Sequence, residues 1–284
     1  MLNINIFKHV ALITSIIALF TQGCKRADSD NFNDPCGGKA PGGLVNLLIS
    51  TNDDLAMGQS VVTEISNNPS KYPVLDSVQY KNAYAHIYRI RDNVLKSGKV
   101  YYKNDFPWRV RIIRDDKTLN AFCTPGGYIY FYTGLIKYLD NETQLAGVMG
   151  HEIAHADRRH SANQMMKQYG AIALVQILTG GDPGLLSQIA VGLLALKFSR
   201  DDETEADDYS VRYLYPTPYD PRGAKFFFEK ISAGGGVGIP EFLSTHPNPD
   251  NRVENITKMW ECLGSRNDGQ TFDARYQDFK NSLP

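Results

Sequence analysis

Two histidines four residues apart, with a glutamate directly after the first, are the strongest chemical signal in this sequence. His151, Glu152 and His155 occur in the stretch GVMGHEIAHADRR at residues 147–159. Residues four apart on a helix share a face, so both imidazoles can bind one metal ion, and zinc accepts such nitrogens at about 2.0–2.1 Å. Glu152 lies about 100° around the helix and can take a proton from a water whose pKa zinc lowers towards ~7. A lone match of this length is weak evidence, because a helix can carry two histidines by chance.

An acidic stretch further along the chain supplies candidates for a third ligand, which a catalytic zinc site with one open position requires. Residues 198–209 read FSRDDETEADDY, in which Glu203 and Asp207 are again four apart. One carboxylate can bind the metal while the other orients a zinc-bound histidine, and Glu205 is a competing ligand. Acidic runs are more often solvated helix faces or N-terminal caps. Because both patterns occur in order at a plausible separation, we predict one zinc ion per chain.

The beginning of the chain has the composition of a leader and a tether. Residues 10–20, VALITSIIALF, are almost wholly apolar, but this run is too short to cross a ~30 Å hydrocarbon core and is typical of a secretory signal. Cys24 follows in an order that resembles a bacterial lipobox, although Thr21 stands where leucine is usual. We expect residues 1–23 to be a lipoprotein signal peptide, Cys24 to be lipidated, and residues 24–45 to be a flexible tether. An ordinary signal peptide is the alternative.

The remaining cysteines limit the possible disulfides, and the overall charge limits the possible partners. Cys36, Cys123 and Cys262 allow at most one bridge in an oxidising compartment, and a Cys36–Cys262 pair is conceivable because Cys123 sits in an apparent strand. The formal net charge is -1 and no long basic block occurs, so nothing indicates nucleic acid as a partner. A hydrophobic content of 42% is ordinary for a chain with a buried core.

Periodicity predicts the elements that position these residues. Apolar side chains recur at helical spacing in residues 53–67, 76–96 and 140–169. Short β-prone runs at residues 108–114, 119–123 and 128–132 indicate a small sheet. The predicted fold class is therefore α+β and predominantly helical, with a small sheet beside the histidine-bearing helix, in one domain over residues 46–284.

Residues 170–198 are strongly apolar and are divided by the turn sequence Gly-Gly-Asp-Pro-Gly. Each half is shorter than the ~20 residues that a membrane-spanning helix needs. We expect a pair of buried or plug-like helices. The alternative is a hairpin that faces a membrane or gates access for a substrate.

Four stretches of the sequence together resemble one known family. They are NAFCTPGGYIYFYTGL at residues 120–135, HEIAH at 151–155, FSRDDETEAD at 198–207 and STHPNPDNRVENI at 244–256. On these motifs, residues 50–263 are similar to metallopeptidase family 48, whose members have a gluzincin-type metalloprotease domain. Without membrane-spanning helices after the leader and without tetratricopeptide repeats, the chain looks most like the stand-alone periplasmic lipoprotein branch of that family.

The resemblance assigns roles to the motif residues. It implies zinc ligands at His151, His155 and Glu203, a general base at Glu152, and an orienting carboxylate at Asp207. The family pattern Glu-x-x-x-Asp selects the first of the two competing glutamates as the ligand.

The resemblance also implies a function for two further features. Asn120, Ala121 and Phe122 resemble an edge strand to which an extended substrate adds through backbone hydrogen bonds; a core strand is the structural alternative. His246 lies in a loop, where a lone histidine is usually a surface residue. The family implies instead that it approaches zinc as a temporary fourth ligand or donates to the oxyanion of the reaction.

Charged residues near these motifs are expected to be mainly structural. Arg252 either ties the His246 loop to the acidic helix or is an ordinary surface arginine. Arg159 and His160, which follow the histidine-bearing helix, are expected to have structural roles only.

The combined prediction is a zinc-dependent endopeptidase of the bacterial cell envelope. We expect it to hydrolyse misfolded or unassembled envelope proteins on the periplasmic side, held by its lipid to a membrane; Lys25 after the cysteine favours the outer membrane. The rival interpretation is an envelope chaperone or adaptor with a structural or occluded zinc site. Glu152 separates the two, because hydrolysis requires it and a structural site does not.

Overall fold

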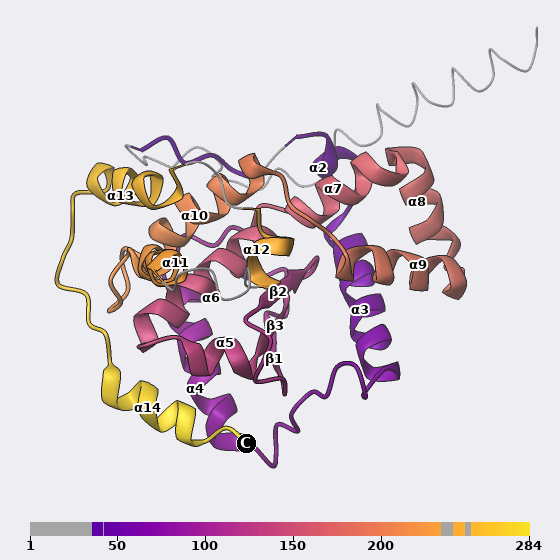
Figure 1. Cartoon of the computed structure of the whole chain (residues 1–284). Helices are drawn as coiled ribbons and strands as arrows, with labels where there is room; N and C mark the ends of the chain where they lie inside the picture. The colour runs from indigo at the N-terminus through magenta and orange to yellow at the C-terminus, as the bar shows by residue number, and fades with distance from the viewer. Residues whose placement is uncertain (1–35, 42, 234–240, 248–250) are drawn as a thin grey trace, which may run out of the picture. The chain divides into compact units, whose positions relative to one another are not determined.

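A fully buried helix and a small sheet beside it form the framework of the protein (Figure 1). The computed structural model describes residues 36–41, 43–233, 241–247 and 251–284, and residues 41–284 form one compact unit. Helix α6 spans Glu142–Asp157, and all 16 of its residues are buried. A helix buried on every side is expected at the centre of a domain, and α6 carries both histidines of the HEIAH motif.

The sheet has three strands in the order β1-β3-β2. Strands β1 (Arg109–Ile113) and β3 (Tyr128–Tyr132) are parallel, and β2 (Ala121–Thr124) pairs antiparallel with β3. The turn at Pro125-Gly126-Gly127 connects β2 to β3 and places both glycines at positive φ, where a residue without a side chain is favoured. Strand β2 packs on α6, so the edge strand of the sheet lies against the histidine-bearing helix.

The other helices surround this framework (Figure 1). They are α2 (Leu44–Leu48), α3 (Thr51–Asn67), α4 (Lys81–Leu95), α5 (Thr133–Tyr138), α7 (His160–Tyr169), α8 (Ala171–Gly180), α9 (Pro183–Leu194), α10 (Arg200–Leu214), α11 (Gly223–Ala233), α12 (Glu241–Thr245), α13 (Arg252–Cys262) and α14 (Asp273–Asn281). The predicted α+β, predominantly helical fold with a small sheet is confirmed.

Small residues let two helices approach α6 closely. Helix α11 crosses α6 at Gly147, where an added Cβ would overlap the backbone of Gly223 and Ala224. Helix α10 lies against Gly150, where a Cβ would sit 2.8 Å from Ser210 Oγ. The Ser210 hydroxyl also donates a hydrogen bond of 2.8 Å to the Gly147 carbonyl. The glycines of GVMGHEIAH thus set the distance between the two helices that carry the motif residues.

The beginning of α6 is held by a buried carboxylate. Glu142 accepts hydrogen bonds from Tyr219 at 2.6 Å, Arg89 at 2.7 Å and Arg275 at 2.8 Å. These partners keep the pKa of Glu142 below its usual value, although burial alone would raise it. Because the three donors come from α4, the segment before α11, and α14, this one side chain ties the first turn of α6 to distant parts of the chain.

The predicted helical region over residues 140–169 is divided into two helices, because the chain turns sharply after α6. Arg159 adopts a left-handed conformation with φ 61° and separates α6 from α7. Its buried guanidinium donates to Asp54 at 2.7 Å, to Asn46 at 2.8 Å and to the Ile49 carbonyl at 2.8 Å. These contacts with α2 and α3 offset the local strain of a positive φ, and they were invisible in the helical periodicity.

Residues 170–198 form two helices that are buried on one side only. Helix α9 packs along α3 (Figure 1), and Leu174, Ile189 and Leu193 enter a core shared with α3 and α7. Ile172 on α8 and Val191 on α9 remain exposed, so of the predicted buried or plug-like helices only one side is buried. Over the described part of the chain, none of the helices has the length and apolar character that crossing a membrane requires.

The N-terminal predictions fall mostly outside the described residues, including the signal peptide and the lipidation site Cys24. Helix α2 begins at Leu44, so the last two residues of the predicted tether are helical. Cys36 and Cys262 are each disulfide-bonded, whereas Cys123 is free and buried in β2.

Because α6 and α11 cross closely, one methyl group added at Gly147 should destabilise the fold strongly. Gly147→Ala should lower the free energy of unfolding by about 1–3 kcal/mol or more, because the rigid backbone of α11 must move to admit the added methyl group. The matched control is Gly180→Ala at the end of α8, where nothing lies within 4 Å of an added Cβ. Equilibrium denaturation would measure both. Equal stabilities for the two variants would show that the helix crossing tolerates a side chain.

Candidate metal centre

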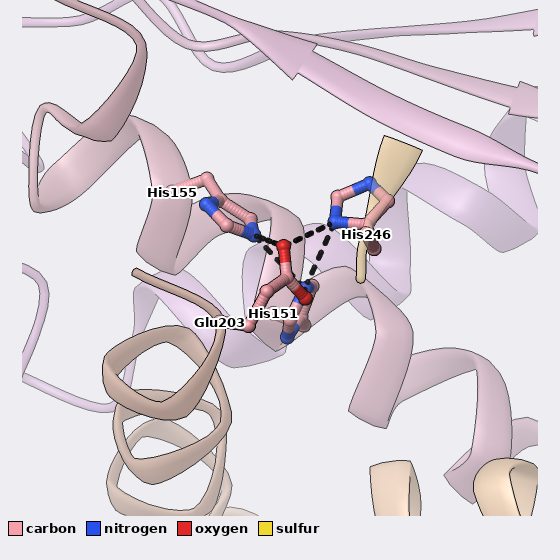
Figure 2. A group of neighbouring side chains, drawn as sticks. All are labelled: His151, His155, Glu203 and His246. Carbon is pink, nitrogen blue, oxygen red and sulfur yellow. Dashed lines mark hydrogen bonds and ion pairs between the residues drawn. The ribbon is translucent and has the colours of Figure 1, made fainter. Parts of the chain in front are cut away.

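Four buried side chains from three parts of the chain converge on one point (Figure 2). His151 and His155 come from one face of α6, Glu203 from the first turn of α10, and His246 from the residue that follows α12. One potential ligand atom from each of these residues lies within 4.8 Å of those of the other three. All four side chains are at most 1% exposed.

The Glu203 carboxylate lies between the three imidazoles. Its Oε1 is 3.3 Å from His155 Nε2 and 3.0 Å from His246 Nδ1, and its Oε2 is 3.4 Å from His151 Nε2. His151 Nε2 and His155 Nε2 are 2.9 Å apart. Ligands at about 2.0–2.1 Å in a tetrahedral site are separated by roughly 3.3–3.4 Å, so these donors need only small shifts to surround a zinc ion.

The pKa values of the clustered side chains are shifted because burial and neighbouring charges act on them in opposite directions. Burial alone would raise the pKa of Glu203, but the charge of His246 and hydrogen bonds from the histidines hold it well below its usual range. Burial alone would lower the pKa of His151, but Asp207 and Glu203 raise it to about 9. Burial and the charge of His151 depress the pKa of His155 well below its ordinary value. A buried carboxylate among three imidazoles is a donor set that a divalent cation would stabilise, which fits a metal site.

Asp207 orients the first histidine, as its spacing predicted. Its Oδ1 is 2.9 Å from His151 Nδ1, the nitrogen that faces away from the cluster. The guanidinium of Arg252, at the start of α13, donates to Asp207 at 2.8 Å and to Glu203 at 3.1 Å. Arg252 is therefore no surface residue: it is buried and ties the segment after His246 to the acidic helix, which confirms that interpretation.

Glu205 does not belong to the cluster, which resolves the competition between the two glutamates. Its side chain accepts from Arg158 at 2.9 Å and pairs with His160 Nε2 at 2.9 Å. Two residues along a helix rotate a side chain by about 200°, so Glu205 and Glu203 cannot face the same point. The preference for Glu203 as the ligand agrees with this geometry.

His246 is completely buried, so the surface alternative is wrong. Its Nδ1 lies 3.4 Å from His151 Nε2, and its ring stacks on Phe242 at 4.3 Å between centroids. The Phe242 amide donates to the Leu119 carbonyl at 3.1 Å, directly before β2. The short helix α12 thus lies alongside the start of the edge strand and delivers its histidine into the cluster.

Glu152 is a buried carboxylate with little to compensate its burial, because its polar neighbours are the Cys123 thiol and the ring of His246. Neither of its oxygens has a hydrogen-bond partner among the described residues, and its nearest charged neighbour is His246, whose Nε2 lies 3.6 Å from Glu152 Oε1. Burial raises the pKa of Glu152. Burial, and then the charge of Glu152, raise the pKa of the Cys123 thiol well above its usual value. An unpaired buried acid is costly and indicates a group kept for a substrate or a water.

The predicted substrate strand lies at the edge of the sheet. Asn120 and Ala121 are buried, and Phe122 stacks on Tyr130 at 4.8 Å. The Asn120 carbonyl accepts from the Tyr132 amide at 3.1 Å, while its side-chain oxygen is buried without a partner. Among the described strands, β2 pairs only with β3, so its second edge has no strand partner there.

Two groups around the cluster were not identified as functional from the sequence. The ring of Phe198 stacks on His155 with 3.8 Å between centroids and 21° between planes. His160 Nδ1 lies 2.9 Å from His155 Nδ1, the ring nitrogen that does not face the cluster. The only signal for His160 was its position five residues after His155, just beyond the histidine-bearing helix, and nothing in the sequence showed that it returns towards the site.

Comparison with known proteins agrees with the geometry. Residues 81–260 match peptidase family M48. The chain is 36% identical over 152 residues to the mitochondrial metalloendopeptidase OMA1 of Arabidopsis thaliana, covering 53% of this chain and 31% of that protein. It is 33% identical over 162 residues to the β-barrel assembly-enhancing protease of Escherichia coli K12, covering 52% and 33%.

A longer match extends to the β-barrel assembly-enhancing protease of Yersinia pestis. It is 28% identical over 233 residues and covers 75% of this chain and 45% of that protein. The chain thus spans less than half the length of each of these three relatives. The family match includes all four cluster residues and covers more than half of the sequence. This chain therefore belongs to peptidase family M48, whose members are zinc-dependent, and the cluster of His151, His155, Glu203 and His246 is able to bind that metal.

Proposed function

We propose that the protein is a zinc-dependent endopeptidase. The observation that carries the proposal is the unpartnered, buried Glu152 carboxylate directly beside the zinc site. A structural zinc site is closed by its ligands and needs no free acid. Zinc held at this site would polarise a carbonyl oxygen and lower the pKa of a water towards ~7.

The residues around the site divide the work of hydrolysis. Glu152 accepts the proton of the attacking water and then delivers it to the leaving amine, as a general base that becomes a general acid. Its pKa, which burial raises, brings it closer to the neutral range where such transfers are efficient. Asp207 and Arg252 hold His151 and Glu203 in place through the hydrogen bonds already described.

The edge strand supports binding of an extended peptide. Strand β2 lies against α6 and offers a second edge to a substrate strand, through backbone hydrogen bonds that are independent of sequence. The buried side-chain oxygen of Asn120 has no partner among the described residues and is available to a peptide N–H. Such binding favours unfolded segments and flexible loops, because a folded helix or sheet has no free backbone to offer.

We further propose that the protein acts in the bacterial cell envelope on misfolded or unassembled proteins. The apolar leader followed by Cys24 supports export and lipid anchoring, and disulfides at Cys36 and Cys262 suit an oxidising compartment. Two of the relatives are named for β-barrel assembly in bacteria, whereas another is named as mitochondrial. The leader and the lipobox-like cysteine favour the envelope.

One observation favours a second candidate, a chaperone or adaptor with an occluded zinc site. His246 lies among the ligand atoms and its Nε2 faces Glu152 at 3.6 Å, so it fills space that a substrate carbonyl and a water would need. The same geometry also describes a peptidase in a resting state. Variants at Glu152 and His246 separate these possibilities.

Glu152→Gln should retain zinc and lose cleavage of an unfolded protein such as casein by about 10²–10⁴-fold, because the amide cannot accept the proton. Zinc content by metal analysis and cleavage rates would be measured together. The matched control is Glu254→Gln on α13, where the glutamate is 55% exposed and pairs with Lys258. If Glu152→Gln cleaves as fast as the wild type, Glu152 is not the base.

His246→Ala should weaken zinc binding and raise basal casein cleavage several-fold, because Nδ1 leaves the ligand cluster and the space beside Glu152 opens. Zinc affinity by chelator competition and initial cleavage rates would be compared with the wild type. A loss of about 10²–10³ in kcat at unchanged zinc affinity would instead assign His246 to oxyanion stabilisation. No change in either quantity would contradict both roles. Absence of chelator-sensitive cleavage in both the wild type and this variant would favour the adaptor.

A further inference from the structure

The outward-facing nitrogen of His155 is bound to another histidine and not to a carboxylate. His155 Nδ1 lies 2.9 Å from His160 Nδ1, and His160 Nε2 lies 2.9 Å from Glu205 Oε2. The His160 side chain is 2% exposed, and it is absent from the group of potential metal ligands. Three side chains therefore form a line that leads from the zinc site towards the surface.

Only one arrangement of protons fits this line when His155 binds a metal. A ligating Nε2 carries no proton, so the neutral imidazole of His155 has its proton on Nδ1 and donates it. His160 Nδ1 must then accept, which places the proton of His160 on Nε2. That nitrogen donates in turn to the Glu205 carboxylate. Each contact has one donor and one acceptor, and the chain selects the tautomer of His155 that frees Nε2 for zinc.

The geometry of α10 explains why an intermediate residue is needed. Asp207 is four residues after Glu203, about 40° away around the helix, and reaches His151 directly. Glu205 is two residues after Glu203, about 200° away, and its carboxylate points away from the ligands. His160 bridges that gap, because the left-handed turn at Arg159 brings the first residue of α7 back towards α6.

The far end of the line is fixed as well. Arg158 donates through its Nε to Glu205 Oε1 at 2.9 Å, and its Nη2 lies 2.9 Å from the same oxygen. Its guanidinium also lies over the ring of Tyr209, 4.2 Å from the centroid. The Glu205 side chain is 39% exposed, so this end of the line faces solvent and can be substituted without leaving a buried cavity.

We propose that His160 is a positioning residue that, backed by Glu205, fixes the tautomer and ring orientation of the zinc ligand His155. The two histidine ligands are thus held by two separate carboxylates of one helix: Asp207 contacts His151, and Glu205 reaches His155 through His160. Phe198 fixes the plane of the His155 ring by stacking, and His160 fixes its rotation within that plane. The proposal concerns zinc affinity and holds whatever substrate the enzyme cleaves.

The test is the zinc dissociation constant of the full chain, measured by competition with a chelator. His160→Phe keeps a ring but removes the acceptor, and should raise the Kd for zinc about 10–100-fold. His160→Asn should recover part of this loss, because its amide oxygen can accept from His155 Nδ1. The control is His86→Phe on α4, which lies outside the group of potential ligands and where the stacking on Phe279 is retained. Arg89, which lies 3.1 Å from His86 Nδ1, keeps its pairing with Glu142, so the Kd should stay unchanged.

Thermal unfolding of the zinc-free variants separates positioning from folding. A purely structural residue would lower the Tm of the zinc-free protein and leave the Kd unchanged, and that result overturns the proposal. An Asn variant that binds zinc no better than the Phe variant also overturns it. Casein cleavage is not needed for either reading, so these results are independent of the proposed peptidase activity.

If His160→Phe does not fold, Glu205→Ala decides the question at the exposed end of the line. The proposal expects a zinc Kd raised several-fold, because His160 Nε2 loses its acceptor and the tautomer of His160 is no longer selected. An unchanged Kd in this folded variant overturns the proposal.

Discussion

The structure depends on one buried negative charge. Glu203 is fully buried between three imidazoles, and an ionised carboxylate removed from water is very costly unless it is paired. His151, Arg252 and a metal ion are the groups that can offset that cost. The helices around it therefore serve to bring positive charge and hydrogen-bond donors to one point. Breaking one partner leaves the others uncompensated, since buried charges depend strongly on each other.

Close helix packing makes this arrangement precise. Gly147 and Gly150 allow α11 and α10 to approach α6, which sets the distance from the histidines to Glu203. Polar side chains behind the ligands then fix the orientation of each ligand side chain. Asp207 and Arg252 act on one side, and His160, Glu205 and Arg158 on the other. The two oxygens of Glu152 have no hydrogen-bond partner among the described residues, as suits a group that must bind and release a proton. Helix α6 thus carries both kinds of residue: the glycines that pack against other helices and the glutamate that would transfer a proton.

His246 occupies a place among the potential metal ligands. The imidazole reaches the cluster from the end of α12, which is bound to the start of the edge strand through Phe242 and Leu119. A peptide that adds to β2 would compete for the same region.

The sequence by itself determined the elements with local signals. The four-residue spacing of His151 with His155, and of Glu203 with Asp207, placed the candidate ligands on shared helix faces because helical periodicity is a property of neighbouring residues. The family resemblance then selected Glu203 as the ligand. Strand β3 was predicted at its observed bounds, and the mostly helical fold followed from apolar periodicity. What only the tertiary structure decided depends on contacts between distant segments. The turn at Arg159 is held by Asp54, His246 is buried by α12, and Glu205 is turned from the zinc towards His160. No local pattern encodes these contacts, because their energies arise only when the helices pack.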